Sequence, residues 1–154
     1  MKYEYIMKLR GFDICKGYED KDVKLPKRAT AHSAGYDFFA VEDVTIQPNE
    51  IKVVFTGVKA YMQPNEVLIL ANRSGNPIKK NLELANGVGI VDADYYENPE
   101  NDGNIGFQFK NTSTEPVTIR KGEKLGQGIF TYYLLADDDN ATDQRQGGFG
   151  STGG

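Results

Sequence analysis

The sequence predicts an all-β protein, on three observations. Apolar and polar residues alternate with the two-residue period of strands, in residues 51–55 and 105–109. Clusters of turn-forming residues separate such stretches, for example at 63–65 and 121–123. No segment sustains a long helical stripe, although residues 76–81 could form one helical turn or two. Many short strands separated by turns are typical of a β-sandwich or a β-barrel.

Length and composition limit the class of protein further. A chain of 154 residues is expected to form one domain with a real core. The net charge of −4 argues against a protein that binds nucleic acid through bulk electrostatics. Cys15 is the only cysteine, which excludes an intrachain disulfide, and no apolar run approaches the roughly 20 residues of a membrane span. We therefore predict a soluble cytoplasmic protein without a membrane partner.

The stretch from residue 86 to residue 95 combines features of a ligand-binding hairpin. Gly87 and Gly89 leave the backbone free of side-chain bulk, so it can turn tightly or approach a ligand closely. An apolar pair then leads into Asp92, and Tyr95 follows three residues later. Such a hairpin could bind a flat ligand through its backbone, with the carboxylate at the pocket edge. The alternative is a buried strand that leaves the core through a polar turn.

Three other segments carry polar residues with two possible roles each. Asp37 lies in an apolar and aromatic run, where it could brace the backbone or face a metal-bound water. The tripeptide 73–75 (Arg-Ser-Gly) follows an apolar strand and could hold an oxyanion, or it could be an exposed arginine before an N-cap serine. Gln127 lies between two glycines, as a structural clamp or as a ligand contact.

The C-terminal stretch has the composition of an anion-binding lid. Five of the final eight residues are glycine, so a free tail is expected to be disordered. It nevertheless carries Arg145, Phe149 and two hydroxyl residues, and such a backbone can wrap an anion. We expect a β domain over residues 1–136 and a flexible arm over 137–154 that closes over a phosphorylated ligand. A disordered linker is the alternative.

Taken together, five segments resemble the motifs of the homotrimeric dUTPase (dUTP diphosphatase) family, in the family's order. The matching segments are residues 34–37 (AGYD), 73–75 (RSG), 86–92 with Tyr95 (NGVGIVD), 122–127 (GEKLGQ) and 147–153 (GGFGSTG). Each motif is weak alone, but five in register are specific.

The resemblance implies a jelly-roll-like β fold, a homotrimer with active sites at subunit interfaces, and hydrolysis of dUTP to dUMP and pyrophosphate. This reaction limits uracil in DNA and supplies dUMP for dTMP synthesis. Mg²⁺ would be bound by the triphosphate, and Asp37 would hold a water of the metal shell. Asp92 would be the general base that activates a water for attack on the α-phosphorus, in agreement with the chemistry of phosphoryl transfer.

The resemblance also implies the remaining site residues. The uracil would be bound by the hairpin residues Asn86, Gly87, Gly89, Ile90 and Val91. Tyr95 would pack under the deoxyribose and exclude a 2′-hydroxyl. Arg73, Ser74, Gly75 and Gln127 would contact the phosphates. From a third subunit, Phe149 would cover the base, while Arg145, Gly150, Ser151 and Thr152 would close on the phosphates.

The chain departs from the family pattern in three places. Ile105 lies ten residues after Tyr95, which implies an insertion of about six residues beside the pocket. The fourth motif has Lys124 and Gly126 where arginine and alanine are common. Arg145 lies four residues before Phe149 rather than the usual five, which places its phosphate role in doubt.

Two other functions remain open at the level of sequence. A dCTP deaminase shares the fold, but its arginine-serine-serine signature and characteristic glutamate are not found around Arg73 and Asp92. A nucleotide-responsive regulatory module would use dUTP as an effector and the insertion at 96–104 as a partner surface. The intact Asp92 favours turnover.

Overall fold

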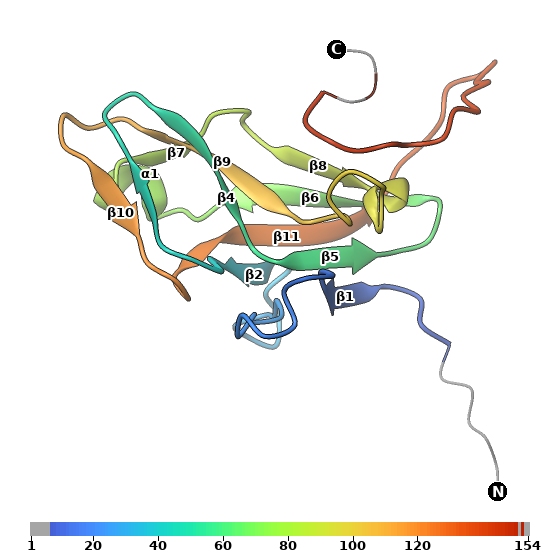
Figure 1. Cartoon of the computed structure of the whole chain (residues 1–154). Helices are drawn as coiled ribbons and strands as arrows, with labels where there is room; N and C mark the ends of the chain where they lie inside the picture. Colours follow the sequence, from blue (N-terminus) through green and yellow to red (C-terminus); the bar gives the residue numbers. More distant parts are fainter. Residues whose placement is uncertain (1–6, 151, 153–154) are drawn as a thin grey trace, which may run out of the picture.

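The computed structural model describes residues 7–150 and residue 152 (Figure 1). These residues form eleven short strands, one short α-helix and one turn of 3-10 helix, which confirms the predicted all-β class. The elements are β1 (Gly11–Ile14), β2 (Tyr36–Phe39), β3 (Val44–Ile46), β4 (Ile51–Phe55), β5 (Val58–Tyr61), β6 (Glu66–Asn72), α1 (Asn76–Lys79), β7 (Leu82–Leu84), β8 (Gly89–Asp92), η1 (Ala93–Tyr95), β9 (Gly106–Asn111), β10 (Val117–Ile119) and β11 (Lys124–Tyr132).

The strands pair antiparallel into four sheets. The largest has the strand order β2-β11-β6-β8, and a second has the order β4-β9-β7. Two further pairs, β1-β5 and β3-β10, complete the fold. Neighbours in each sheet are distant in sequence, for example β2 and β11, as expected for a jelly-roll-like fold.

The two larger sheets pack against each other through aromatic side chains. Phe38 of β2 lies with its ring centroid 5.6 Å from that of Phe107 of β9, and Phe109 stacks on Phe107 at 6.1 Å. All three side chains are buried, together with Leu68 of β6. β9 alternates half-buried and buried residues along its whole length, so one face of this strand forms the centre of the core.

The periodicity of the sequence located strands better than it located their faces. The alternation at 105–109 marks core residues, because Ile105, Phe107 and Phe109 are all buried. In β4, by contrast, the buried residue is Val54, while Ile51 is exposed. The sequence analysis also did not identify β1, β3 or β5 as strands. The predicted helical turn at 76–81 is confirmed as α1.

Packing explains one departure from the family pattern. A Cβ atom placed on Gly126 would lie 2.4 Å from Cε1 of Phe107 and 2.7 Å from the carbonyl oxygen of Ala71. Alanine does not fit beside this ring, so phenylalanine at position 107 requires glycine at position 126. Lys124, two residues earlier, lies with Nζ 3.2 Å from the Asp37 carboxylate.

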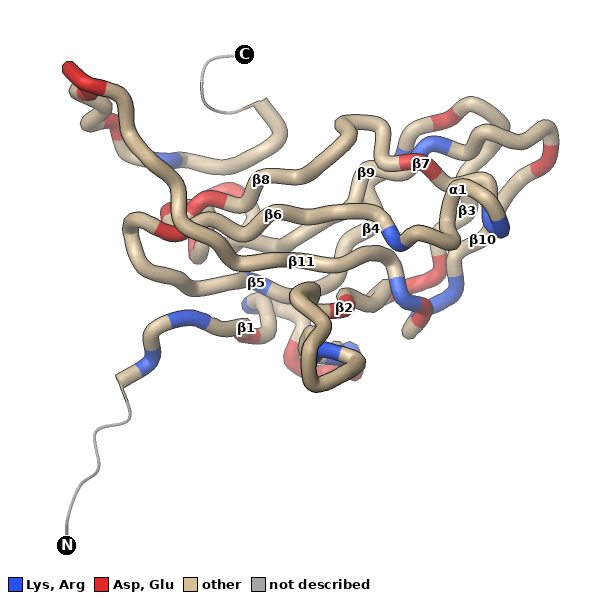
Figure 2. Tube along the Cα trace, turned by 180° about the vertical axis from the view of Figure 1, so that it is seen from behind, with Lys and Arg blue, Asp and Glu red and all other residues tan. Residues whose placement is uncertain are grey.

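Charged residues of both signs are interspersed along the described chain, with acidic residues grouped beside the loop that follows β8 (Figure 2). In the part of the chain that the structure describes, no helix has the length and apolar character required to cross a membrane. The single cysteine, Cys15, is buried, and burial raises the pKa of its thiol to about 12. A buried thiol with a raised pKa is a poor nucleophile, so Cys15 acts as a core side chain.

Replacing Gly126 with alanine is expected to destabilise the fold by about 1–3 kcal/mol, because the added methyl group overpacks the core against Phe107. The measurement is the free energy of unfolding in denaturant. Gly75→Ala is the matched control, since the nearest atom to its added Cβ would be Cδ of Lys79 at 3.7 Å. Equal stability of the two variants would contradict the packing argument.

Candidate active site

A cavity of the described chain lies over the turn between β7 and β8, within the stretch for which the sequence predicted a ligand-binding hairpin. The two strands do not pair with each other, because β7 pairs with β9 and β8 pairs with β6. The stretch is therefore a turn that joins two sheets, and the name hairpin is kept for residues 86–92.

The volume of this cavity is about 160 Å³. It is lined by the hairpin and η1, by β6 and β9, and by the C-terminal arm: Leu70, Asn86, Gly89, Ile90, Val91, Asp92, Tyr95, Ile105, Gly106, Gln108, Arg145, Gly148 and Phe149. The structure thus brings eight of the predicted site residues together in one chain: Asn86, Gly89, Ile90, Val91, Asp92, Tyr95, Arg145 and Phe149.

The hairpin owes its position to close packing of its backbone on β6. Gly89 pairs with Leu70, and a Cβ atom on Gly89 would lie 2.9 Å from Cδ1 of that leucine. Gly87 adopts a φ of +77°, which favours glycine, and forms the turn without lining the cavity. Ile90 remains 59% exposed although it is a large apolar residue, so the hairpin presents a surface that a flat ligand could cover.

Asp92 lies at the last position of β8, at the edge of the cavity. Its carboxylate accepts a hydrogen bond from Nη2 of Arg145, and Nε of the same guanidinium binds the Asp94 carboxylate at 2.6 Å. Arg145 also donates to the carbonyl oxygen of Gly147, and only 15% of its side chain is exposed. A cation from the arm is therefore held between Asp92, which ends β8, and Asp94, which lies two residues later.

Tyr95 forms a wall of the cavity and is held in place by the insertion. Its hydroxyl donates to the carbonyl oxygen of Asn104 at 2.6 Å and accepts from Nδ2 of Asn101 at 2.9 Å. Burial raises the pKa of Tyr95, while the hydrogen bond from Asn101 acts in the opposite direction. The hydroxyl thus stays protonated at neutral pH and keeps the ring fixed. Gly148 of the arm packs on this ring, because a Cβ there would lie 2.6 Å from Cε2.

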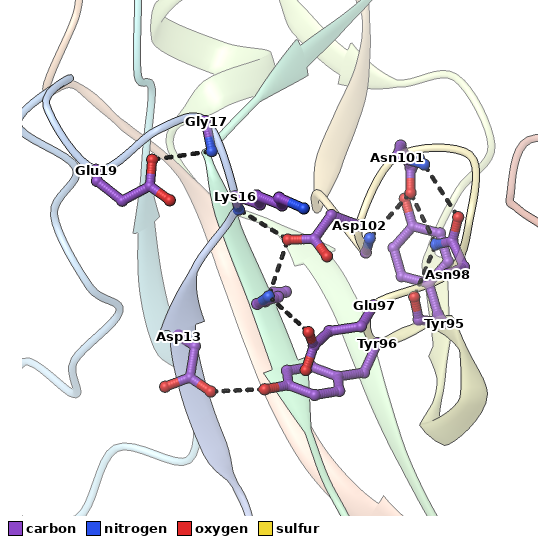
Figure 3. A network of polar contacts seen from close by, with 12 residues as sticks. Asp13, Lys16, Gly17, Glu19, Tyr95, Tyr96, Glu97, Asn98, Asn101 and Asp102 are labelled. Atoms are coloured by element: carbon purple, nitrogen blue, oxygen red, sulfur yellow. Dashed lines mark hydrogen bonds and ion pairs between the residues drawn. The ribbon is translucent and has the colours of Figure 1, made fainter.

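A network of charged groups anchors the insertion to the rest of the domain (Figure 3). Lys59 of β5 is almost buried, and its Nζ lies 2.8 Å from Asp102 and 3.3 Å from Glu97. The backbone N–H of Lys16 also donates to Asp102. The hydroxyl of Tyr96 donates a hydrogen bond to the carboxylate of Asp13 in β1. Burial by itself would raise the pKa of Asp102, but the bonds from Lys59 and Lys16 outweigh it and hold this pKa below the ordinary value of 3.8.

A second group of predicted site residues lies elsewhere in the chain. Asp37, Arg73, Ser74, Gly75 and Gln127 do not line the cavity. Asp37 faces Gln127 across the β2-β11 pair. Asp92 pairs with Val67 near the start of β6, and Arg73 follows the end of that strand. At about 3.3 Å per residue, the six positions from Val67 to Arg73 separate the two groups by roughly 20 Å.

Asp37 and Gln127 of this second group make polar contacts within the described chain. Asp37 is paired with Lys124, and Gln127 makes only a long bond of 3.4 Å to the Asn72 carbonyl oxygen. Gly35 packs against this amide, since its Cβ would lie 2.2 Å from Oε1 of Gln127. The described residues contain no cluster of three or more metal-ligating side chains. Asp37 is thus a single carboxylate within β2, which suits contact with a metal-bound water and does not form a complete ligand set.

The arm folds over the cavity of its own chain, whereas the resemblance implies an arm from another subunit. Phe149 lies with its ring centroid 6.0 Å from that of Phe55, at an interplanar angle of 78°. Phe149 and Gly150 adopt positive φ values of 54° and 100°. Gly150 and Thr152 are exposed, and the predicted phosphate contact Ser151 lies outside the described residues.

Sequence reasoning missed several lining residues, including Leu70, Gln108 and Gly148. Gln108 had a usable signal, because it is the polar member of the alternating pattern in β9. Glu100 of the insertion, which contacts the arm, had no such signal, since nothing in the sequence indicates which insertion residue faces the pocket.

The fold and the cavity define an all-β protein with a pocket for a small ligand, edged by a carboxylate and covered by an arginine-bearing arm.

The dUTPase family profile matches residues 21–153 of the chain. The deoxyuridine 5′-triphosphate nucleotidohydrolase of Lactococcus lactis subsp. lactis is 50% identical over 96% of this chain and 99% of its own length. The crystal structure of the Streptococcus mutans dUTPase matches with a TM-score of 0.79 at 50% identity, over 82% of this chain and 98% of that one. The dUTPase of Staphylococcus aureus phage phi11, at 22% identity and a TM-score of 0.71 over 88% of this chain and 97% of that one, shares the fold. The chain belongs to the dUTPase family.

Stability is expected to fall in acid as Asp102 becomes protonated. The folded state lowers the pKa of Asp102, so the ionised carboxylate adds to the free energy of unfolding at pH values above its ordinary pKa. This added stability is lost as the pH falls below about 4. Asp102→Asn should cost about 1.5–3 kcal/mol at pH 7, and it should weaken the loss of stability between pH 5 and 3.

The measurement is the free energy of unfolding across this range of pH. The exposed Asp20→Asn has the same change of charge and is the control. An acid dependence that is the same in both variants would argue against the Lys59–Asp102 contact as its source.

Proposed function

We propose that the protein hydrolyses dUTP to dUMP and pyrophosphate, which limits uracil in DNA and supplies dUMP for dTMP synthesis. Family membership supports the substrate class, and the position of Asp92 at the edge of the hairpin cavity carries the assignment of the reaction. A carboxylate in this place can activate a water beside a ligand that lies on the hairpin.

The hairpin residues and Tyr95 would bind the nucleoside. Asn86, Gly87, Gly89, Ile90 and Val91 offer backbone donors and acceptors that could pair with uracil and exclude cytosine by mismatch. The close packing of Gly89 on Leu70 leaves the backbone in a narrow hairpin, which would exclude the methyl group of thymine. The fixed ring of Tyr95 would pack under the deoxyribose and leave no space for a 2′-hydroxyl.

Asp92 would act as the general base on a water that attacks the α-phosphorus. In the described arrangement its carboxylate is bound by Arg145. A triphosphate offers the guanidinium more oxygens in bidentate geometry than Asp92 does. Transfer of Arg145 from Asp92 to the phosphates would release the carboxylate for a water and bring the arm over the substrate. This supports the predicted phosphate role of Arg145, with Gly150, Ser151 and Thr152 contributing backbone and hydroxyl donors.

The remaining phosphate contacts are proposed to come from a neighbouring subunit. Arg73 lies roughly 20 Å from Asp92 within one chain, by the register of β6, and Ser74 and Gly75 follow it. Gln127 pairs with Ala71 near the same end of β6. A homotrimer in which the second group of one chain meets the hairpin of another would complete the site. Tyr132 at the end of β11 and Leu135 beyond it are exposed, which is consistent with a further interface.

Mg²⁺ bound by the triphosphate would screen the charge of the phosphates and polarise the reacting phosphoryl group. Magnesium typically keeps several waters and takes one or two protein carboxylates in addition to substrate phosphates. Asp37 would accept hydrogen bonds from one of those waters, and Lys124 holds its carboxylate in place.

Asp92→Asn should lower kcat for dUTP by about 10²–10⁴-fold, because the amide cannot accept the water's proton. Binding of a non-hydrolysable dUTP analogue should be retained. Asp94→Asn is the matched control, since Asp94 also binds Arg145 but does not line the cavity. Its exposed ion pair contributes at most about 1 kcal/mol, so kcat should fall by less than about fivefold. Pyrophosphate release is the measurement, and ammonia release from dCTP would indicate a deaminase instead.

Mixed trimers test whether the site is shared between chains. Arg73→Ala and Asp92→Asn should each be nearly inactive alone. In trimers assembled from equal amounts of both variants, about a quarter of shared sites would combine an intact Asp92 with an intact Arg73. The mixture should therefore recover roughly a quarter of the native activity. No recovery in trimers shown by mass spectrometry to be mixed would place both residues in a site of one chain.

A further inference from the structure

The insertion between Tyr95 and Ile105 contacts the C-terminal arm through Glu100. The backbone N–H of Glu100 donates to the carbonyl oxygen of Gln146 at 3.1 Å. The N–H of Gly148 donates to Oε2 of the same glutamate at 3.1 Å. One residue thus binds the arm on both sides of Gly147, through one backbone and one side-chain hydrogen bond.

The arm has the small residues that this contact requires. Gly147 is buried, and a Cβ atom there would lie 1.5 Å from Oε2 of Glu100. Gly148 also packs closely, since a Cβ atom there would lie 2.6 Å from Cε2 of Tyr95. The paired glycines allow the arm to pass between Glu100 and Tyr95, where any larger side chain would displace it.

Glu100 is itself held on a rigid support. Asn98 is buried, and its Nδ2 donates to the carbonyl oxygen of Tyr95 at 2.7 Å. Its Oδ1 accepts from the backbone N–H groups of Glu100 and Asn101. Asn101 in turn donates to the Tyr95 hydroxyl. The loop that carries Glu100 and the ring that lines the cavity therefore form one bonded unit.

We propose that Glu100 is a positioning residue that docks the arm over the cavity, an inference that rests on the proposed function. The docked glycines place Arg145 beside Asp92 and Phe149 at the cavity. An arm that is ordered before substrate binds loses less conformational entropy when it closes, so affinity is higher. The insertion then serves the site of the enzyme, instead of a partner surface.

The first test needs no substrate. Arg145 is the only lysine or arginine after Lys124, so trypsin releases the nine-residue peptide 146–154 only by cutting at the arm. Glu100→Ala should release this peptide several-fold faster than the native protein. Glu100→Gln should remain close to native, because its amide oxygen can still accept from Gly148. Glu97→Ala is the control, since Glu97 belongs to the same loop but binds Lys59. The melting temperature of each variant shows that cleavage reports the arm and not global unfolding.

The second test is kinetic. Glu100→Ala should raise KM for dUTP about tenfold, the size expected for one charge-assisted hydrogen bond, with kcat changed less than about twofold. Glu100→Gln should restore most of the loss, and Glu97→Ala should leave KM unchanged. Equal peptide release from Glu100→Ala, Glu97→Ala and the native protein would overturn the proposal, as would a loss of kcat at constant KM. Faster release from Glu100→Ala in a protein that does not hydrolyse dUTP would support the docking contact and reject the proposed function.

Discussion

β8 pairs with β6 in an antiparallel register that places Asp92 opposite Val67 and Gly89 opposite Leu70. Side chains alternate between the two faces of a strand, so Ile90 and Asp92 lie on the same face of β8. A shift of one residue in the register would move both side chains to the opposite face, away from the cavity. The packing of Gly89 on Leu70 opposes such a shift, since only glycine fits at that point. The cavity, the position of the Asp92 carboxylate at its edge and the separation from Arg73 all depend on this register.

The C-terminal arm brings positive charge to the edge of the cavity beside Asp92. The loop after β8 carries several acidic residues, and the chain as a whole has a net charge of −4. Arg145 pairs with Asp92 at the end of β8 and with Asp94 two residues later. Under the proposed function the same guanidinium would bind phosphate, which would link occupancy of the pocket to exposure of the Asp92 carboxylate. The insertion provides the support against which the arm folds.

Much of the fold and part of the site could be predicted from sequence. Two-residue periodicity identified β9, and the glycines of the 86–92 stretch indicated the turn that precedes β8. The periodicity failed in β4, where Phe55 faces the arm and Val54 faces the core, so both faces of the strand are apolar. The strands β1 and β5 were missed because they pair with each other across a long separation in sequence, and neither has a strong pattern of its own.

The sequence by itself determined the strand class, the five motifs and hence the family, because these depend on residue types at short spacings. Tertiary structure alone decided that Arg73 and Asp92 lie at different ends of β6, that Gly126 makes room for Phe107, and that Glu100 contacts the arm. Each of these is a contact between segments far apart in the chain. Such contacts follow from strand register and packing, and no local pattern of residues encodes them.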